Sequence, residues 1–245
     1  MSATDSARLD TLVSLGGVGK HYGSSEIIKD ISLHLDRGEF VSIIGPSGCG
    51  KSTIFNLIAG LIDDHSGHMS IQGSVGYMQQ KDLLLPWKTV LDNIALPLVL
   101  KGESRKAGRE RANSYIELMG LRGYEDEYPY RLSGGMKQRA SFLRTFLASE
   151  ETMLLDEPFG ALDSITKSKM QRWLLDIKTN LNLSILLITH DIDEALLLSD
   201  RLYIMSSRPG RIIRELHLPM LREDKTKRLV SGELLSIKED ILTLL

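Results

Sequence analysis

The stretch GPSGCGKST, residues 45–53, constrains the fold of this chain more than any other part of the sequence. It fits the pattern G-x-x-x-x-G-K-[ST] and lies between the apolar run EFVSIIG (39–45) and STIFNLIAGL (52–61), whose apolar residues have helical spacing. A strand, a glycine-rich turn and a helix are therefore expected in this order. Free backbone N–H groups at such a helix start, together with the helix dipole, make the turn a candidate phosphate-binding loop.

In a phosphate loop of this kind the lysine reaches the β- and γ-phosphates of a nucleoside triphosphate, and the hydroxyl after it holds Mg²⁺. Lys51 and Ser52 occupy these two positions. The backbone of the loop supplies the other contacts. The predicted nucleotide-binding residues of the loop are Gly45, Pro46, Ser47, Gly48, Cys49, Gly50, Lys51, Ser52 and Thr53.

Two more apolar runs, TMLLDEP (152–158) and SILLITHD (184–191), read as strands, and a crossover helix is expected between them over 164–181. Continuous apolar strands suit a sheet that is covered on both faces. Asp156 ends the first run, where a carboxylate beside a phosphate loop can hold the magnesium shell, and Glu157 next to it can polarise an attacking water. An ordinary acidic turn at the end of a strand remains the alternative.

The stretch 86–145 has a mainly helical pattern without strand-like runs, which indicates an insertion into the α/β core. Its run KGESRKAGRER (101–111) is expected to be a solvated helix face, with a contact to lipid headgroups as the weaker alternative. Beyond residue 220 the chain is charged and then amphipathic from Ser231, which predicts a short closing helix. The polar N-terminus (1–10) does not read as a signal peptide and is expected to be flexible.

Composition narrows the classes of protein that remain. The net charge is −2, so no global basic field attracts nucleic acid, and the single cysteine excludes an intrachain disulfide. Apolar stretches such as IALPLVL (94–100) are far shorter than the roughly 20 residues that cross a bilayer. A cytoplasmic protein is expected.

The motifs together resemble the ATP-binding cassette (ABC) ATPases. The phosphate loop, LSGGMKQR (132–139), MLLDEP (153–158), GALD (160–163) and ITHD (188–191) follow one another in the order and spacing of that family, over roughly residues 10 to 215. The resemblance implies an α/β fold: a phosphate-loop NTPase (RecA-like) core with a small antiparallel β subdomain and an inserted α-helical subdomain. It implies one ATPase domain over 11–220, with core 11–85 and 146–220 and helical subdomain about 86–145, followed by a helical tail, 221–245.

In this family two copies sandwich two ATP molecules head to tail, and the LSGG stretch of one copy faces the γ-phosphate held by the other. Ser133, Gly134 and Gly135 would then offer a hydroxyl and closely approaching N–H groups at a helix start. The alternative is that Ser133 is a plain N-cap, which explains the serine but not the glycine pair. Asp163, in GALD, matches the loop that crosses the dimer interface.

The resemblance also assigns catalytic roles. Glu157 matches the general base, Asp156 the magnesium-shell carboxylate, and His190 the switch histidine that contacts the γ-phosphate and supports the attacking water. Gln80 matches the nucleotide-sensing glutamine, which also binds the metal; it is preferred to its neighbour Gln79 because LLPW then falls at the family's spacing.

Tyr22, in KHYG, matches the aromatic residue that stacks on adenine, although a tyrosine here is equally compatible with a partly buried core position. The stretch KDLLLPWKTVLDNIALPL (81–98) resembles the importer ATPases of the nitrate, sulfonate and taurine type, and YPYRLSGGM and GRIIRELHLPM fit the same type. In these transporters the region receives a short cytoplasmic helix of the membrane subunit. Leu85, Pro86 and Trp87 are the candidates for that contact; a core position for Trp87 is the alternative.

The resemblance therefore implies ATP and Mg²⁺ as ligands. The implied partners are a second copy of the chain, a permease that holds it at the inner face of the cell membrane and, indirectly, a solute-binding protein, with no nucleic acid. Soluble members that act on ribosomes or DNA, and a stand-alone nucleotide switch, are the alternatives. One uninterrupted cassette without a heptad run weighs against the ribosomal and DNA-acting members. The cargo is expected to be a small solute such as nitrate, a sulfonate, taurine or a vitamin precursor.

Overall fold

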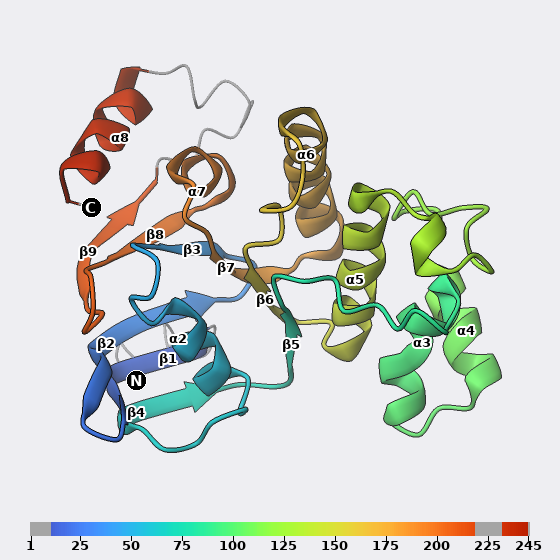
Figure 1. The fold of residues 1–245 in the computed structure, drawn as a ribbon, viewed down its shortest axis with the longest axis horizontal. Helices are drawn as coiled ribbons and strands as arrows, with labels where there is room; N and C mark the ends of the chain where they lie inside the picture. The colour runs from blue at the N-terminus through green and yellow to red at the C-terminus, as the bar shows by residue number, and fades with distance from the viewer. Residues whose placement is uncertain (1–10, 219–231, 245) are drawn as a thin grey trace, which may run out of the picture. The chain divides into compact units, whose positions relative to one another are not determined.

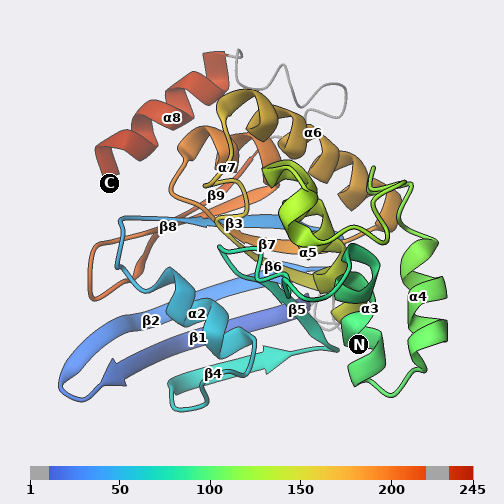
Figure 2. The ribbon, with the colours of Figure 1, turned by 45° about the vertical axis from the view of Figure 1, so that its right-hand side comes forward.

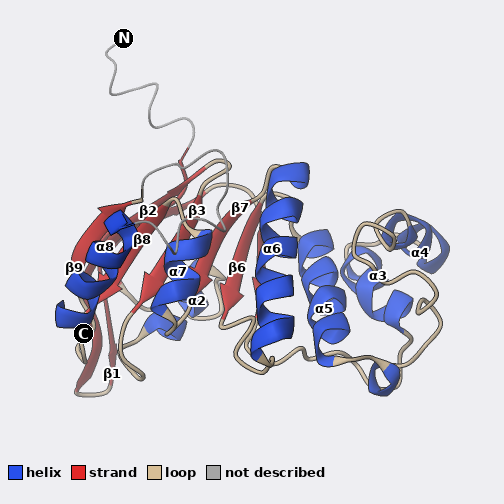
Figure 3. Cartoon of the chain, turned by 90° about the horizontal axis from the view of Figure 1, so that it is seen from above, coloured by secondary structure: helices blue, strands red, loops and turns tan. Residues whose placement is uncertain are grey.

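The computed structural model describes residues 11–218 and 232–244, and the segments 1–10 and 219–231 of the predicted termini lie outside the described residues. The chain divides into two compact units. One unit contains the chain up to Gly73 and from Leu175 onward, and the other is Ser74–Leu174. Helices connect successive strands from β6 to β8, and strands and helices both occur throughout the described residues, so the fold is α/β, as the sequence predicts (Figure 3).

An antiparallel sheet opens the first unit. Strand β1 (Thr11–Tyr22) lies between β2 (Ser25–Asp36) and β4 (Ser66–Ile71), and both pairings are antiparallel (Figure 2). β1 and β2 form a hairpin in which Tyr22 pairs with Ser25 across a tight turn, and Gly23 takes a positive φ of 58° there. This sheet is the predicted small antiparallel β subdomain.

The same unit contains buried parallel strands. β3 (Phe40–Ile44) lies between β7 (Ser184–Ile188) and β8 (Arg201–Met205) and is parallel to both, while β9 (Ile212–His217) pairs with β8 in the antiparallel direction. Every residue of β3, β7 and β8 is buried, as expected for continuous apolar strands. The helices that lie wholly in this unit are α2 (Lys51–Ile58), α7 (Ile192–Leu198) and α8 (Gly232–Leu244).

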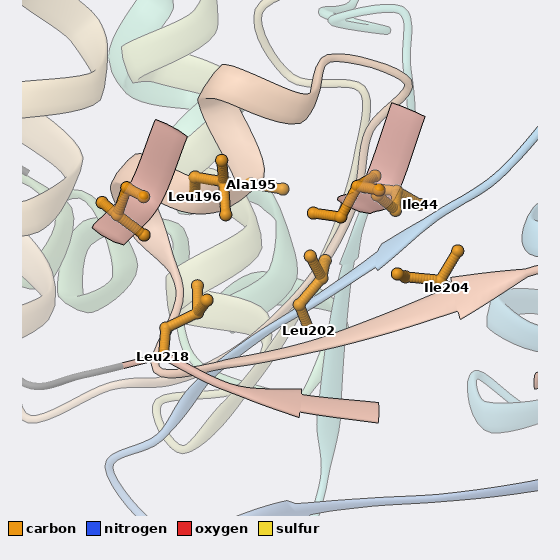
Figure 4. Close-up of a cluster of buried hydrophobic side chains, with 8 residues drawn as sticks. Ile44, Ala195, Leu196, Leu202, Ile204 and Leu218 are labelled. Carbon is orange, nitrogen blue, oxygen red and sulfur yellow. The ribbon is translucent and has the colours of Figure 1, made fainter. Parts of the chain in front are cut away.

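A cluster of aliphatic side chains fixes α7 and α8 to these strands. Figure 4 shows its members from β3, α7, β8 and the chain after β9; with the two from α8 they are Ile44, Ala195, Leu196, Leu202, Ile204, Leu218, Leu234 and Ile241. Each is at most 5% exposed, so burial of this apolar surface stabilises the arrangement. α8 lies next to α7 (Figure 1) and is the helix that the amphipathic pattern beyond Ser231 predicts.

The second unit begins with β5 (Val75–Met78), which pairs in parallel with β6 (Thr152–Asp156). Its helices are α3 (Val90–Leu100), α4 (Arg105–Asn113), the short 3-10 helix η1 (Pro129–Arg131) and α5 (Gly134–Ala148), while α6 (Ser164–Leu181) runs across the boundary of the two units. No strand occurs between 86 and 145, a stretch that the structure describes completely, so the helical prediction is confirmed. α3 packs against both α4 and α5.

Hydrogen bonds and ion pairs stabilise the helical stretch locally. Thr89 caps α3 and Ser104 caps α4, each accepting a backbone N–H at 3.2 Å. Arg105 and Arg109 of α4 both bind Asp92 of α3, at 2.7 and 2.8 Å. The basic run 101–111 is therefore only partly the solvated face that was expected, because it also ties the two helices together.

Candidate functional site

The phosphate loop joins β3 to α2 and has a backbone that only glycine adopts readily. Gly48 has φ 77° and Gly50 has φ 104°, both in the left-handed region. Space is limited as well: a Cβ at Gly50 would lie 2.4 Å from Ile28 Cγ2, and one at Gly45 would lie 2.9 Å from Met205 Cβ. The N-cap position of α2 is Gly50, which has no side-chain cap. The first turn of α2 therefore has no side-chain acceptor at the position where many helices supply one.

Lys51 points into this loop. It is the first residue of α2, is 7% exposed, and its Nζ donates to the carbonyl oxygens of Gly45 at 2.7 Å and Pro46 at 2.9 Å. A buried ammonium that is held by neutral carbonyl oxygens is stabilised further when an anion takes their place. Ser47, Gly48 and Ser52 are exposed beside it. The combination is a candidate anion site built from one continuous stretch of chain.

The acidic pair lies where β6 ends. Asp156 is 9% exposed, and Tyr77 of the neighbouring β5 donates its hydroxyl to Asp156 Oδ2 at 3.2 Å. Burial, and secondly the Asp156 charge, raise the pKa of Tyr77, so this phenol stays a neutral donor. Glu157 has a φ of 46°, which is uncommon for a residue other than glycine. The left-handed backbone conformation at Glu157 therefore sets the direction of its side chain.

Gln80 contacts the second carboxylate. Its Nε2 donates to Glu157 Oε2 at 3.0 Å, so Gln80 and not Gln79 is the glutamine in this contact. The structure thus brings together three of the predicted residues, Gln80, Asp156 and Glu157, within the unit Ser74–Leu174. Their roles toward a nucleotide stay predictions.

The LSGG turn begins α5. Ser133 is exposed and its Oγ accepts the N–H of Met136 at 3.4 Å, so it is an N-cap, as one of the two interpretations holds. The glycine pair has a packing reason that the sequence did not supply. A Cβ at Gly134 would lie 3.3 Å from Leu162 Cδ2, and one at Gly135 would lie 3.2 Å from Thr166 Cγ2. Close helix packing and a role for an anion are compatible, because the N-terminus of α5 is exposed.

Asp163 and His190 lie at other helix starts. Asp163 Oδ1 accepts the N–H groups of Ile165 at 3.1 Å and Thr166 at 3.0 Å, and the Thr166 backbone hydrogen bond is the main cause of its lowered pKa. Asp163 therefore has a structural role that the sequence reading did not assign. His190 is exposed after β7, just before the N-cap Asp191 of α7.

Exposure decides two open alternatives. Tyr22 is 51% exposed at the end of β1 and Trp87 is 71% exposed, so neither is a core residue. Pro86 is exposed and Leu85 is partly buried. The sequence reading missed Tyr77, because its contact with Asp156 depends on the pairing of β5 with β6. It also missed Lys20, which lies two residues before Tyr22.

The described residues, 11–218 and 232–244, contain no group of three His, Cys, Asp or Glu side chains arranged to hold a metal ion. Among them there is also no helix with the length and apolar character needed to cross a membrane.

A strand–loop–helix anion site with a buried lysine, and an acidic strand end with its glutamine, define a phosphate-loop nucleotide-binding protein. The sequence profile described as "ABC transporter" matches residues 28–160, more than half of the chain. The chain belongs to the ABC transporter family.

Individual relatives match over nearly the whole chain. The formylaminopyrimidine import ATP-binding protein of Halalkalibacterium halodurans is 45% identical over 91% of this chain and 91% of its own length. The nitrate import ATP-binding protein of Synechocystis is 42% identical over 86% and 82%. Among solved structures, a dimeric ATP-binding cassette in a post-hydrolysis state with ADP and Pi superposes with a TM-score of 0.71, at 31% identity over 84% of this chain and 99% of that one.

Proposed function

We propose that this chain is the ATP-hydrolysing subunit of an importer for a small solute, and that it works as a homodimer bound to a separate membrane permease. The observation that carries the proposal is Lys51, buried in a glycine loop at the uncapped start of α2. The relatives support the importer assignment, because they are named import ATP-binding proteins, and this favours it over a ribosomal, DNA-acting or stand-alone ATPase. The dimeric cassette with ADP and Pi supports both hydrolysis and the homodimer.

ATP binds through its phosphates and its base. Backbone N–H groups of the loop, Pro46 excepted, donate to the phosphate oxygens, and Lys51 exchanges the carbonyls of Gly45 and Pro46 for the β- and γ-phosphates. This exchange replaces two hydrogen bonds to neutral acceptors by charge-assisted ones, which are stronger. Tyr22, half-exposed at its hairpin, stacks on adenine.

The donor set suits Mg²⁺. Ser52 offers a hydroxyl, Asp156 a carboxylate and Gln80 an amide oxygen, all of them hard oxygen ligands. A magnesium ion bound with substrate phosphates needs only one or two carboxylates from the protein. When bound, the ion neutralises negative charge on the phosphates. Tyr77 keeps Asp156 oriented by its hydrogen bond to Oδ2.

Hydrolysis transfers the γ-phosphoryl group to water. Glu157 accepts the proton of the attacking water as general base, and His190 contacts the γ-phosphate. Gln80 Nε2 donates to Glu157 Oε2 at 3.0 Å and so orients the base, while the amide oxygen of Gln80 would be the atom that holds the metal. Ser133, Gly134 and Gly135 of one copy complete the γ-phosphate site of the second copy, with Asp163 in the interface loop. Catalysis is positioning and charge stabilisation.

The membrane partner contacts Leu85, Pro86 and Trp87, of which Trp87 presents the largest exposed apolar surface. Through the permease, the chain is held at the inner face of the cell membrane and works with a solute-binding protein. The relatives named above import different solutes, formylaminopyrimidine and nitrate. We infer that the other subunits select the cargo, and that this subunit neither contacts it nor binds nucleic acid.

The substitution Glu157→Gln tests the proposal. The variant is expected to bind ATP with unchanged affinity, to lose at least roughly 100-fold in turnover because the general base is gone, and to accumulate as an ATP-bound dimer on a sizing column. Glu117→Gln, at a glutamate whose side chain is 80% exposed, is the control and should behave as wild type. Normal turnover in Glu157→Gln would remove Glu157 from its role.

A further inference from the structure

Lys20 is a buried lysine outside the phosphate loop. It is 5% exposed on β1, and its Nζ donates to Asp64 Oδ2 at 2.9 Å. The same ammonium lies over the ring of Tyr22, 5.1 Å from the ring centroid. A lysine is rarely buried unless its charge is paired, and here the partners are one carboxylate and one aromatic face.

Tyr22 needs such a contact to keep its ring in one orientation. It is the last residue of β1, at the tight turn where it pairs with Ser25, and it remains 51% exposed. A side chain at the tip of a hairpin has few neighbours to pack against. Lys20 supplies one from beneath, and Asp64, in the segment between α2 and β4, fixes the ammonium in place.

We propose that Lys20 is a positioning residue for the nucleotide base: its ammonium holds Tyr22 by one face of the ring, so that the other face is presented to adenine. The inference rests on the proposed role of Tyr22. A ring that is ordered before binding loses less conformational entropy when the base stacks on it, and this raises affinity. Lys20 therefore acts on the base of the ligand and not on its phosphates.

Isothermal calorimetry of Lys20→Met with two ligands tests this. ATP carries the base, and inorganic tripolyphosphate carries a similar charge without it. ATP binding is expected to weaken about two- to fivefold, the range of an exposed cation–π contact, while tripolyphosphate binding stays unchanged. Lys20→Arg should restore ATP binding, because a guanidinium also lies well over an aromatic ring. Lys29→Met, at a half-exposed lysine of β2, is the control.

The role of Tyr22 and that of Lys20 fail in different ways. Tyr22→Ala should weaken ATP binding, and adding Lys20→Met to it should change nothing further. If Tyr22→Ala leaves ATP binding unchanged, both the base assignment and this inference are overturned. If Tyr22→Ala weakens ATP binding but Lys20→Met does not, the inference alone is overturned. Equal weakening of both ligands in Lys20→Met also overturns it, because Lys20 then acts through the fold.

A second variant covers the case in which Lys20→Met fails to fold. Asp64 has a side chain that is 94% exposed, so Asp64→Ala leaves the packing intact while it removes the acceptor that holds the ammonium. It should weaken ATP binding and spare tripolyphosphate. Unchanged affinity for ATP in Asp64→Ala would overturn the positioning role.

Discussion

Glycines stand at the starts of both α2 and α5, yet only α5 has a side-chain cap. The N-cap of α2 is Gly50, which has φ 104° and no side chain to cap the helix, and the first residue of the helix, Lys51, folds back onto carbonyl oxygens. The N-cap of α5 is Ser133, which has φ −65° and whose hydroxyl accepts a backbone N–H. The start of α2 therefore lacks the side-chain acceptor that the start of α5 has. We therefore expect the phosphate loop to bind nucleotide alone and the LSGG turn to contribute only when a second copy is present.

Removing the lysine should give the largest effect. Lys51→Ala deletes a charge that makes two hydrogen bonds in the loop, and we expect the affinity of the isolated subunit for ATP to fall roughly 100-fold, since a hydrogen bond to a charged group contributes about 1.5–3 kcal/mol. Calorimetry measures it. Lys106→Ala, at a side chain that is 87% exposed, is the matched control. Unaltered ATP affinity in Lys51→Ala would contradict the phosphate-loop assignment.

The charged side chains that join α3 to α4 pair with one another within the chain. In this they resemble the capped start of α5 and differ from the uncapped start of α2. Hydrogen bonds from Arg105, which have the largest effect, and from Arg109 lower the pKa of Asp92 to about 2. Because the folded pKa lies below the ordinary value of 3.8, the stabilisation is complete above pH 3.8 and is lost as the pH falls through 2. Asp92→Asn should cost about 1–2 kcal/mol at neutral pH, after allowance for the solvent exposure of Arg105.

Urea unfolding at pH 7 and at pH 3 checks this prediction. The difference in unfolding free energy between wild type and Asp92→Asn should narrow at the lower pH. Asp126→Asn, at an 83% exposed partner of Arg109, should have little effect at either pH. A difference that does not depend on pH would show that Asp92 stabilises α3 and α4 by shape and not by charge.

Ser133 separates the two roles of the LSGG turn. Ser133→Ala removes the N-cap of α5 and should cost about 1 kcal/mol of stability, while ATP binding to the isolated subunit stays unchanged and turnover of the dimer falls. Ser104→Ala removes the corresponding cap of α4 and should cost a similar amount without affecting turnover. Equal turnover in the two variants, measured at matched folded fractions, would reduce Ser133 to a cap.

The parts of the fold that could be predicted are those with local signals. β3, β6 and β7 are continuous apolar runs, and the phosphate loop marks the start of α2. β4 and β9 escaped the sequence reading because most of their residues are exposed or partly buried and show no apolar run. The β1–β2 hairpin was implied only by the family resemblance, because LGGVGKHYG contains four glycines and the pairing has register irregularities.

The candidate site divides in the same way. Motif residues such as Lys51, Asp156 and Glu157 could be named because their spacing is a signal in itself. The contacts that orient them could not, because they join residues that are far apart in the chain: Tyr77 reaches Asp156, and Lys20 reaches Asp64. Only the strand pairings and the course of the loops bring such residues together.

Gly135 tests whether the LSGG turn is shaped by packing, and we expect the smallest effect here. In Gly135→Ala a Cβ would lie 3.2 Å from Thr166 Cγ2, so overpacking costs about 1–2 kcal/mol, part of which the better helix propensity of alanine offsets. Thr166→Ser removes that methyl group, so the double variant should regain the loss in urea unfolding. If Gly135→Ala instead has the unfolding free energy of wild type but no turnover, Gly135 acts at the nucleotide site of the second copy and not in packing. The start of α5 would then resemble that of α2 more closely than its serine cap indicates.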